Sequence, residues 1–532
     1  MSAASQPELS AAAPAAAPRP LHVLFFMQHL GRYLRFFDSV IRLMIERGHS
    51  VHLVFEYKED KPGGLVDSWL NRMAQHPRFH WSVSEAWRRD PWFRVARRVR
   101  AALDYVYFLQ LGEDRVPFLV KRSRHRAPRA IRVVMRLPGL RSRVGLRAAA
   151  AVLGAFDDAM PLSRGVQQLV RDEEPDVVLV TPHLMPGSTD LHYVRSTAPT
   201  GVPTGICIAS WDNLSSKQLL RVVPDLVTVW NETQEQEAVD LHEMPRDRVV
   251  VTGAQCFDHW FGWPPRPREE FLARVGLDPS KPYILFTGGS LFPAWRTEAE
   301  FCVDWIDAVR ASREPALREA SILIRSHPKR NHEWRAIDFG RFEDVVLWPP
   351  HVDSPVEEQT RADYFDSIYH SAVVVGVNTS AMIEAGAIGR AVHTILLPEF
   401  ADSQVGVLHF RYLHEIGGGL VQVSNDLAEH VGRLEDVMTG RDTEGEEAAR
   451  RFTELFVRPQ GIEVPATPIF VDAIEELAGR GPYERELRPR WLVLLRVPLG
   501  LLRLPPLVTR VRLKLARELR RVAGGLGLAR GH

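Results

Sequence analysis

One segment of the sequence, Val373 to Ile395, combines residue types that could hold an anion beside a diol. An apolar run with the character of a buried strand ends at Gly376-Val377-Asn378, and Thr379 and Ser380 stand where a helix would begin. A helix start presents unpaired N–H groups, so these hydroxyls either cap the helix or bind a phosphate oxygen. Glu384 follows Ser380 by four residues and shares its helix face. Its carboxylate could accept hydrogen bonds from a ribose diol, or it could be an ordinary surface Glu.

The elements that must position this segment alternate between strands and helices. The opening is a strand at Leu21–Met27, a helix carrying Phe36 to Ile45 at helical spacing, and a strand at Val51–Phe55. Further strands are predicted at 177–180, 205–209, 226–230 and 249–252, and then at 283–287, 322–325, 345–348, 373–377 and 392–396. Parallel strands joined by helices indicate an α/β sheet. The Pro-rich stretch Trp263–Arg268 between the two series predicts two tandem, doubly wound, Rossmann-like domains that face a cleft.

The expected boundaries follow from shifts in composition along the chain. Residues 1–20, rich in Ala and Pro, are expected to be a disordered tail rather than a secretory signal. Residues 21–262 and 263–481 are expected to form the two domains, with an Arg-rich helical insertion at about 69–150. Residues 482–532 are expected to form a basic, amphipathic tail.

The composition is that of a folded soluble protein, which excludes collagen-like and wholly disordered chains. Of 532 residues, 45% are hydrophobic and 25% are charged. The three cysteines, Cys207, Cys256 and Cys302, are too scattered for a disulfide framework or a Cys-rich zinc site, and they fit a reducing compartment. The apolar stretch Trp491–Leu502 is interrupted by Arg496 and Pro498 and is too short to span a bilayer.

The net charge of +1 conceals two strongly basic stretches. Residues 88–147 contain 17 Lys or Arg against 4 Asp or Glu, and residues 485–532 contain 12 against 2. Such stretches are either solvated helices or a surface for a polyanion. In the C-terminal stretch the cations alternate with Leu, Val and Trp491, which favours an anionic membrane surface over nucleic acid, because no nucleic-acid-binding module is recognisable. A helix that packs back on the first domain is the alternative.

The span from Leu21 to about Gly481 resembles a GT-B glycosyltransferase. Glu46 to Val51 (ERGHSV) resembles the first βαβ unit of that fold, and Asn378 to Glu384, followed by Gly389 to Val392 (GRAV), resembles its nucleotide-binding turn and helix. Ser326-His327-Pro328, Asn378-Thr379-Ser380 and Gln404–Phe410 (QVGVLHF) further resemble teichoic-acid-type (CDP-glycerol) glycerophosphotransferases and related surface-polysaccharide transferases. The Arg-rich insertion and the C-terminal tail lie outside the resemblance.

The resemblance implies that the second domain binds a nucleotide-activated donor. Its donor-binding residues would be Gly288, Gly289, Ser290, Arg325, Lys329, His351, Asn378, Thr379, Ser380, Glu384 and His409. Among them, the glycines would let the backbone approach a diphosphate closely. Arg325, His327 and Lys329 would stabilise the diphosphate leaving group. Each of these assignments has a structural alternative. Gly288 and Gly289 could simply form a turn, His327 could be held before the turn at Pro328, and His351 could be an ordinary loop residue.

The first domain would then bind the acceptor and supply the base that removes the proton of its hydroxyl group. Candidates at strand ends are His29, His183, Asp190 and Asp212, of which His29 and Asp212 are preferred. His29 follows the first strand directly, and Asp212 lies in the polar segment Ser210–Lys217, which could equally be a capped helix start. With His327, these two are the predicted catalytic residues.

Several other chemistries lack their signatures in the sequence. Asp157-Asp158 does not follow an apolar strand, so no metal-binding DxD motif is evident and a metal-independent reaction without a cofactor is expected. The chain also has no Walker loop and no Gly-x-Ser-x-Gly elbow.

The leading hypothesis is therefore a cytoplasmic, membrane-peripheral transferase. It would move a sugar or a polyol phosphate from a nucleotide donor to a lipid-linked or cell-surface polysaccharide acceptor. A non-hydrolysing nucleotide-sugar 2-epimerase is the second hypothesis, although an epimerase has no need of basic membrane-facing segments. A GT-B-like binding protein without turnover is the third.

Overall fold

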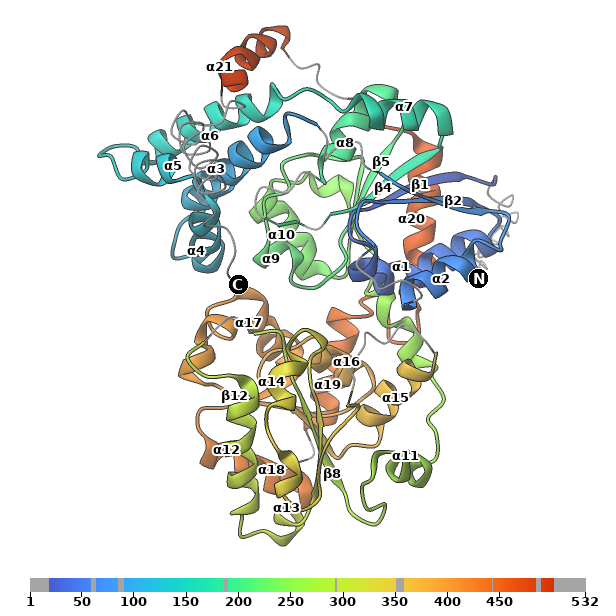
Figure 1. Cartoon of the computed structure of the whole chain (residues 1–532), viewed down its shortest axis with the longest axis vertical. Coiled ribbons are helices and arrows are strands. Elements are labelled where there is room, and N and C mark those ends of the chain that lie inside the picture. The colour runs from blue at the N-terminus through green and yellow to red at the C-terminus, as the bar shows by residue number, and fades with distance from the viewer. Residues whose placement is uncertain are drawn as a thin grey trace, which may run out of the picture.

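The computed structural model describes residues 19–58, 64–84, 90–182, 184–185, 190–291, 294–350, 358–442, 444–484 and 489–501. Two α/β domains lie end to end along the long axis of the molecule (Figure 1). Each is built on one parallel sheet.

The first domain has a seven-stranded sheet in the order β3-β2-β1-β4-β5-β6-β7, and every pair is parallel. Its strands are β1 (His22–Met27), β2 (Ser50–Phe55), β3 (Phe79–Val83), β4 (Val177–Thr181), β5 (Thr204–Cys207), β6 (Leu226–Val229) and β7 (Val249–Val251). All residues of β1 after His22 are buried, because helices cover both faces of the sheet. This burial explains the uninterrupted apolar sequence of the strand.

The second domain repeats the plan with six parallel strands in the order β10-β9-β8-β11-β12-β13. They are β8 (Tyr283–Thr287), β9 (Ser321–Arg325), β10 (Val345–Leu347), β11 (Val373–Gly376), β12 (Val392–Ile395) and β13 (Val421–Ser424). In both sheets the first strand lies inside and the order reverses beside it, which defines a doubly wound fold. The predicted fold class, two Rossmann-like α/β domains of the GT-B type, is confirmed.

The helices cover both faces of each sheet. In the first domain they are α1 (Leu30–Glu46), α2 (Leu65–Met73), α7 (Arg164–Glu173), α8 (His192–Thr197), α9 (Asn213–Ser216) and α10 (Glu232–His242). In the second they are α11 (Arg268–Val275), α12 (Glu298–Arg310), α13 (Pro315–Arg318), α14 (Asn331–Arg335), α15 (Glu358–Tyr369), α16 (Ala381–Ala387), α17 (Leu408–Glu415), α18 (Leu427–Met438) and α19 (Gly445–Phe456). The predicted linker at Trp263–Arg268 runs from the 3₁₀ helix η3 (Gln255–Phe261) to the start of α11.

The last long helix, α20 (Ala466–Arg480), returns to the first domain and packs against α1 (Figure 1). Phe470 meets Phe37 edge to face with 6.0 Å between ring centroids, and Glu475 lies 2.8 Å from His49. The predicted boundaries place this segment in the second domain, which the packing of α20 on α1 corrects. One continuous hydrophobic cluster runs from α1 through η3 and α20 to α16 and α19, so the two domains share part of their core.

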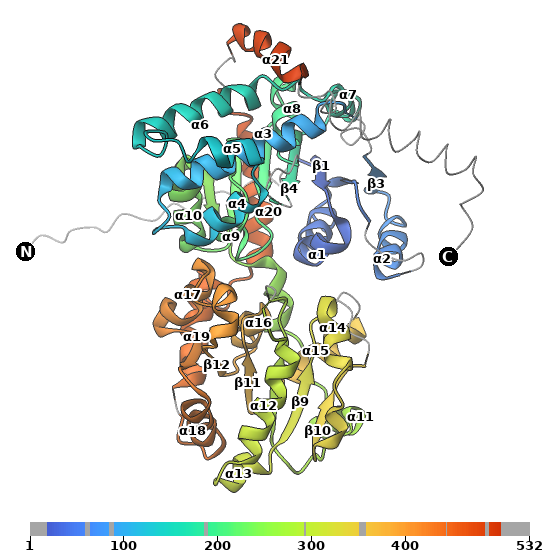
Figure 2. The same ribbon diagram turned by 60° about the vertical axis from the view of Figure 1, so that its left-hand side comes forward.

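The Arg-rich insertion is shorter than predicted. It consists of α3 (Phe93–Leu111), α4 (Pro117–Arg126), α5 (Arg129–Val134) and α6 (Arg143–Asp158), with α3 and α6 side by side (Figure 2). Residues 69–83, predicted to belong to it, instead complete α2 and form β3 at the sheet edge. In β3 only Phe79 is buried and Trp81 is exposed, so an apolar run could not reveal this strand.

A buried ion cluster attaches the insertion to the first domain. Asp157 on α6 accepts hydrogen bonds from Arg100 of α3 at 2.7 Å and from Arg195 of α8 at 2.8 Å. All three side chains are almost completely buried. Burial acts to raise the pKa of Asp157, but the two guanidinium groups outweigh it and hold that pKa well below its usual range.

The C-terminal segment begins on the same insertion. The 3₁₀ helix η8 (Arg490–Leu495) and α21 (Arg496–Leu501) follow residue 489, and Leu492 and Leu499 are buried against Val95 and Met160. Within residues 489–501, the segment therefore packs on the insertion of the first domain, which was the alternative to a membrane-facing segment. The remainder of the predicted amphipathic tail, 502–532, and the predicted N-terminal tail, 1–18, lie outside the described residues. In the described part of the chain, no helix is both long and apolar enough to cross a membrane.

Candidate functional site

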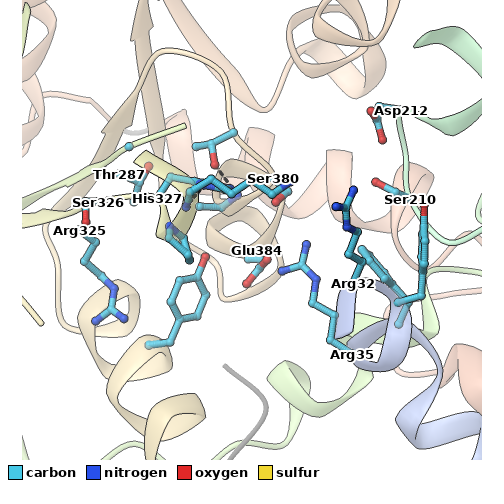
Figure 3. Close-up of a pocket in the computed structure, with 18 of the residues that line it drawn as sticks. Arg32, Arg35, Ser210, Asp212, Thr287, Arg325, Ser326, His327, Ser380 and Glu384 are labelled. Atoms are coloured by element: carbon cyan, nitrogen blue, oxygen red, sulfur yellow. Dashed lines mark hydrogen bonds between the residues drawn. The ribbon is translucent and has the colours of Figure 1, made fainter. Parts of the chain in front are cut away.

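A cavity of about 390 Å³ lies between the two domains (Figure 3). Its walls are the loops and helix starts that follow β1 and β5 of the first domain and β8, β9 and β11 of the second, together with Tyr364 of α15. The carboxyl ends of both sheets therefore meet there, which is where doubly wound sheets bind ligands. The lining from the first domain includes Arg32, Arg35, Ser210, Asp212, Asn213 and Lys217, and that from the second includes Thr287, Gly288, Arg325, Ser326, His327, Lys329, Tyr364, Thr379, Ser380 and Glu384.

The segment after β11 lines the cavity, as its sequence suggested. Thr379, Ser380 and Glu384 all face it, although α16 begins only at Ala381 and is seven residues long. The Thr379 hydroxyl accepts the N–H of Ala381 at 3.4 Å, whereas Ser380 makes no capping bond. The Thr379 hydroxyl thus caps the start of α16, and the Ser380 hydroxyl does not.

Glu384 is buried in the cavity wall, and the side chain of Arg35 reaches toward it from α1 of the opposite domain (Figure 3). Burial raises the pKa of Glu384, while the charge of Arg35 and the hydroxyl of Tyr364 act against that rise. A buried carboxylate that faces a cation across a cleft is a strong hydrogen-bond acceptor for a ligand entering between them. Glu384 is therefore not a surface residue.

Arg325, at the end of β9, is held between two aromatic rings. Its guanidinium carbon lies 5.3 Å from the ring centroid of Trp348 and 5.2 Å from that of Tyr364, and the side chain is buried. Burial lowers the pKa of Arg325 to about 10, so it stays charged at neutral pH. In the part of the chain that the structure describes, Arg325 has no salt bridge to a carboxylate, which leaves its charge available to an anion in the cavity.

His327 lines the cavity as a neutral imidazole. Burial lowers its pKa to about 4, and the charges of Lys329 and Arg35 add to this effect. Its Nδ1 accepts the backbone N–H of Lys329 at 3.1 Å, so Nε2 carries the proton of the neutral ring. His327 is therefore a hydrogen-bond donor and not one of the cations that the sequence analysis grouped with Arg325 and Lys329.

The glycines after β8 do not offer their N–H groups to a ligand. The N–H of Gly288 donates to the carbonyl of Arg325 at 2.8 Å, and that of Gly289 donates to the buried carboxyl of Glu298 at 2.6 Å. Of the predicted Gly288-Gly289-Ser290 loop, only Gly288 lines the cavity, and Ser290 is exposed. The expectation that these glycines bring the backbone close to a diphosphate (a glycine cradle) is therefore wrong. Gly289 is needed for close packing instead, because a Cβ there would lie 2.6 Å from the carbonyl oxygen of Asn378.

Two further predicted donor residues, Asn378 and His409, lie outside the lining. The Asn378 amide donates to the carbonyl of Ser403, which ties the turn after β11 to the 3₁₀ helix η6 (Pro398–Ser403). His409 is buried and packs edge to face on Trp211, with 4.8 Å between ring centroids. His351 lies outside the described residues, as does His183.

The wall from the first domain contains an ion pair. Lys217 Nζ lies 3.1 Å from the carboxylate of Asp212, and both residues line the cavity. Burial acts to raise the pKa of Asp212, but Lys217 and His409 outweigh it and hold the pKa below its usual range. Asp212 is therefore an ionised carboxylate at neutral pH.

Two other base candidates, His29 and Asp190, do not reach the cavity lining. The ring of His29 stacks on Tyr57 with 4.5 Å between centroids, at the point where α1 begins. Asp190 is buried and accepts the backbone N–H groups of Leu184 and Leu191. Of the candidates in the described chain, only Asp212 borders the cavity.

Two cavity cations, Arg32 and Arg35, are not among the predicted site residues. Both lie in the first turns of α1, and in Figure 3 both side chains extend toward the second domain. The available signal was their place directly after the first strand, where a parallel sheet directs residues into the cleft. The lining thus contains five Lys or Arg side chains (Arg32, Arg35, Lys217, Arg325 and Lys329) against two carboxylates (Asp212 and Glu384).

Comparisons with known proteins give similar structures but no family. No family model and no curated protein matches the chain. A glycosyltransferase from Rickettsia africae is 10% identical, with a TM-score of 0.49 over 87% of this chain and 98% of that one. A UDP-GlcNAc 2-epimerase from Neisseria meningitidis is 12% identical, with a TM-score of 0.46 over 86% and 100%. The wall teichoic acid polymerase TagF is 9% identical, with a TM-score of 0.43 over 87% and 90%. Independently of these similarities, the strand order of the chain's own two sheets places it in the GT-B fold.

Proposed function

We propose that this chain is a GT-B-type transferase that uses a nucleotide-activated donor and moves a sugar or a polyol phosphate to a hydroxyl group of an acceptor. The observation that carries the proposal is the interdomain cavity at the carboxyl ends of both sheets, in which cationic side chains outnumber carboxylates. Its volume of about 390 Å³ lies in the range of small-molecule sites. An excess of positive charge suits a nucleoside diphosphate.

The donor phosphates would be held by Arg325 and Lys329, with Arg35 closing from the opposite domain. Arg325 is pre-positioned between Trp348 and Tyr364, so little side-chain entropy is lost when an anion binds. His327 would donate its Nε2 proton to a phosphate oxygen. Glu384 would accept the ribose hydroxyls.

Transfer would then proceed by direct displacement. The acceptor oxygen forms a bond to the donor carbon or phosphorus, the bond from that atom to the leaving nucleotide breaks, and the nucleotide keeps the electron pair. The acceptor proton passes to Asp212. Because Asp212 has a low pKa, it is a weak base that orients the hydroxyl in the ground state and accepts the proton only as the new bond forms. The cavity cations stabilise the charge that develops on the leaving group.

The acceptor would be lipid-linked or a cell-surface polysaccharide, reached at the inner face of a membrane. The part of the cavity wall that carries Asp212 supports this location of the acceptor, because it borders the basic insertion. Arg122 of α4 donates to the carbonyl of Ser216 at 2.6 Å. An acceptor held by the insertion would thus arrive beside Asp212.

The test is thermal unfolding with UDP, CDP, GDP, ADP and CMP. A ligand that binds only the folded state raises the melting temperature, by about 2.7 kcal/mol of stability at a concentration 100 times its Kd. We expect one nucleotide to stabilise the protein, and Lys329→Gln to weaken its binding roughly 10-fold, as the loss of one charge-assisted hydrogen bond would. Arg318→Gln, an exposed residue paired with Glu319 on α13, is the matched control. No stabilisation by any nucleotide would contradict the proposal.

The nucleotide that binds also selects the donor class. CDP would indicate polyol-phosphate transfer, and UDP or GDP would indicate sugar transfer. Release of a free epimerised nucleotide sugar without an acceptor would favour the epimerase instead. Unchanged polymer output in cells with both Glu384→Ala and His327→Ala would favour a binding protein without turnover.

A further inference from the structure

The helical insertion contains an open groove of about 700 Å³ between α3 and the end of α4. It is lined by Arg94, Arg97 and Arg98 on α3 and by His125 and Arg126 on α4. The four arginines are exposed, and the structure gives none of them an ion pair within its described ranges. A groove with this much uncompensated charge fits a partner that presents several anionic groups.

Exposed apolar side chains accompany this charge on the same insertion. On α6, Val144 is 77% exposed and Val152 is 55% exposed. In the segment after α5, Leu137 is 53% exposed. An apolar boundary would bury these side chains favourably, whereas water or a soluble polyanion would not.

The start of the C-terminal segment adds to the same surface. Arg496 donates to the carbonyl of Ala159 at the end of α6 at 2.8 Å, and Figures 1 and 2 both place α21 beside the insertion. Three of its apolar side chains point outward: Trp491 is 56% exposed, Leu494 70% and Val497 73%. The two basic stretches recognised in the sequence therefore meet on one part of the molecule.

The C-terminal remainder of the chain, residues 502–532, is a poor candidate to cover the groove. Residues 502–532 contain eight Lys or Arg and a single carboxylate, Glu518, so this segment repels the arginines rather than neutralising them. Its Leu and Val residues alternate with the cations, as in segments that lie at a bilayer interface. The groove and residues 502–532 therefore suit the same anionic partner.

We propose that the helical insertion α3–α6, together with η8 and α21, is a docking surface for an anionic lipid bilayer, with lipid phosphates in the groove formed by Arg94, Arg97, Arg98 and Arg126. Trp491, Leu494 and Val497 enter the boundary between headgroups and acyl chains. The combination of cations with exposed Trp, Leu and Val selects a bilayer over nucleic acid. Docking does not depend on the proposed transferase activity.

The docking surface has a defined relation to the cavity. Helix α4 carries Arg126 into the groove, while Arg122, one turn earlier, donates to Ser216 at the end of α9, the short helix that follows Asp212. A bilayer on this surface therefore lies one helix away from the wall of the cavity. A lipid-linked acceptor would have a short path to that wall.

The test is co-sedimentation of the full chain with vesicles of phosphatidylcholine alone or with 30 mol% phosphatidylglycerol. We expect binding to the anionic vesicles only. Replacing Arg94, Arg97, Arg98 and Arg126 by Gln should weaken this binding at least 10-fold. The matched control replaces four exposed arginines of the second domain, Arg411, Arg433, Arg441 and Arg450, by Gln and should bind as the parent does.

A second variant tests the apolar part of the surface. Leu494→Asp should reduce vesicle binding with little change in thermal stability, because the side chain is exposed. Equal vesicle binding by the groove and control variants would overturn the proposal. So would tighter binding to duplex RNA that Leu494→Asp leaves unchanged, which would indicate nucleic acid instead. Nucleotide-dependent stabilisation should be the same in all these variants, so a failure of docking is distinguishable from a failure of the proposed function.

Discussion

Tyr412 of α17 donates a 2.7 Å hydrogen bond to the Glu237 carboxyl of α10, and this contact joins the two domains. Both residues lie on the side of the cavity where His409 packs on Trp211. Glu237 is buried, and burial raises its pKa to about 8. The two domains are thus linked by a carboxyl group that is protonated at neutral pH.

We expect Tyr412→Phe to destabilise the protein by about 1 kcal/mol, because the variant keeps the ring but removes the donor to a buried carboxyl. Urea unfolding of the purified chain measures the effect. Tyr483→Phe is the control, because its hydroxyl lies at the surface, 3.5 Å from the carbonyl of Asp247, and it should unfold like the parent. Equal stabilities for the two variants would show that the interdomain hydrogen bond contributes nothing.

The raised pKa of Glu237 predicts a pH dependence of stability. Between pH 4.5 and about 8 the unfolded chain releases this proton while the folded chain retains it, so the contribution of Glu237 to stability falls as pH rises through that window. Glu237→Gln removes this effect. The free energy of unfolding of Glu237→Gln, relative to that of the parent, should therefore increase from pH 5 to pH 8 and stay level above pH 8. Denaturant midpoints across that range provide the measurement, and parallel curves would disprove the assignment.

Gly289→Ala should cost about 1–3 kcal/mol, because the added methyl group would lie 2.6 Å from the backbone oxygen of Asn378. The strain should move the turn before α16 and weaken nucleotide binding as well. Gly154→Ala on α6 is the control: nothing lies within 4 Å of its added methyl group, and the helix should gain about 0.5–1 kcal/mol. Thermal unfolding with and without nucleotide checks both effects. Unchanged nucleotide binding in Gly289→Ala would mean that this turn does not support the site.

Asp157→Asn should be the most destabilising of these changes, at about 3–5 kcal/mol, because it removes the buried carboxylate that pairs with both Arg100 and Arg195. The neighbouring Asp158→Asn is matched in chemistry, but Asp158 is half-exposed and lies 3.5 Å from Arg195, so its effect should be small. Faster proteolytic cleavage within 93–158 in Asp157→Asn would locate the loss at the insertion. Cleavage at the parent's rate would contradict the anchoring role.

Asp212→Asn separates binding from chemistry. The donor would contact mainly the second domain, so its affinity should stay within a few-fold of the parent, while transfer to an acceptor should fall 100-fold or more. His29→Gln is the comparison, since its ring lies outside the cavity lining and stacks on Tyr57. Nucleotide titration and a transfer assay give the two readouts. If His29→Gln lost transfer and Asp212→Asn kept it, the base would have to be reassigned.

Much of the fold could be predicted because buried parallel strands have a simple local signature. The predicted strand at Tyr283–Thr287 matches β8, and that at Val373–Val377 extends only one residue beyond β11. Such strands are covered on both faces, so their sequences are continuously apolar. The edge strands β3 and β13 were missed because half-buried strands such as Phe79–Val83 lack that signature.

The candidate site was predictable only where a residue follows its strand directly. Arg325 ends β9 and His327 and Lys329 follow it, while Thr379, Ser380 and Glu384 follow β11, and all six line the cavity. The glycine cradle failed for a different reason. Sequence shows that Gly289 can approach a phosphate, but only the fold shows that Glu298 already binds its N–H group.

The sequence by itself determined the two tandem sheets, the strand ends that carry polar residues and the presence of two basic stretches, because each depends on neighbours within a few residues. Only the tertiary structure decided that Arg35 faces Glu384 across a cleft, that α20 returns to the first domain, and that α21 packs on the insertion. These relations join residues up to several hundred positions apart. They depend on how whole elements pack, and no local pattern of side chains encodes that packing.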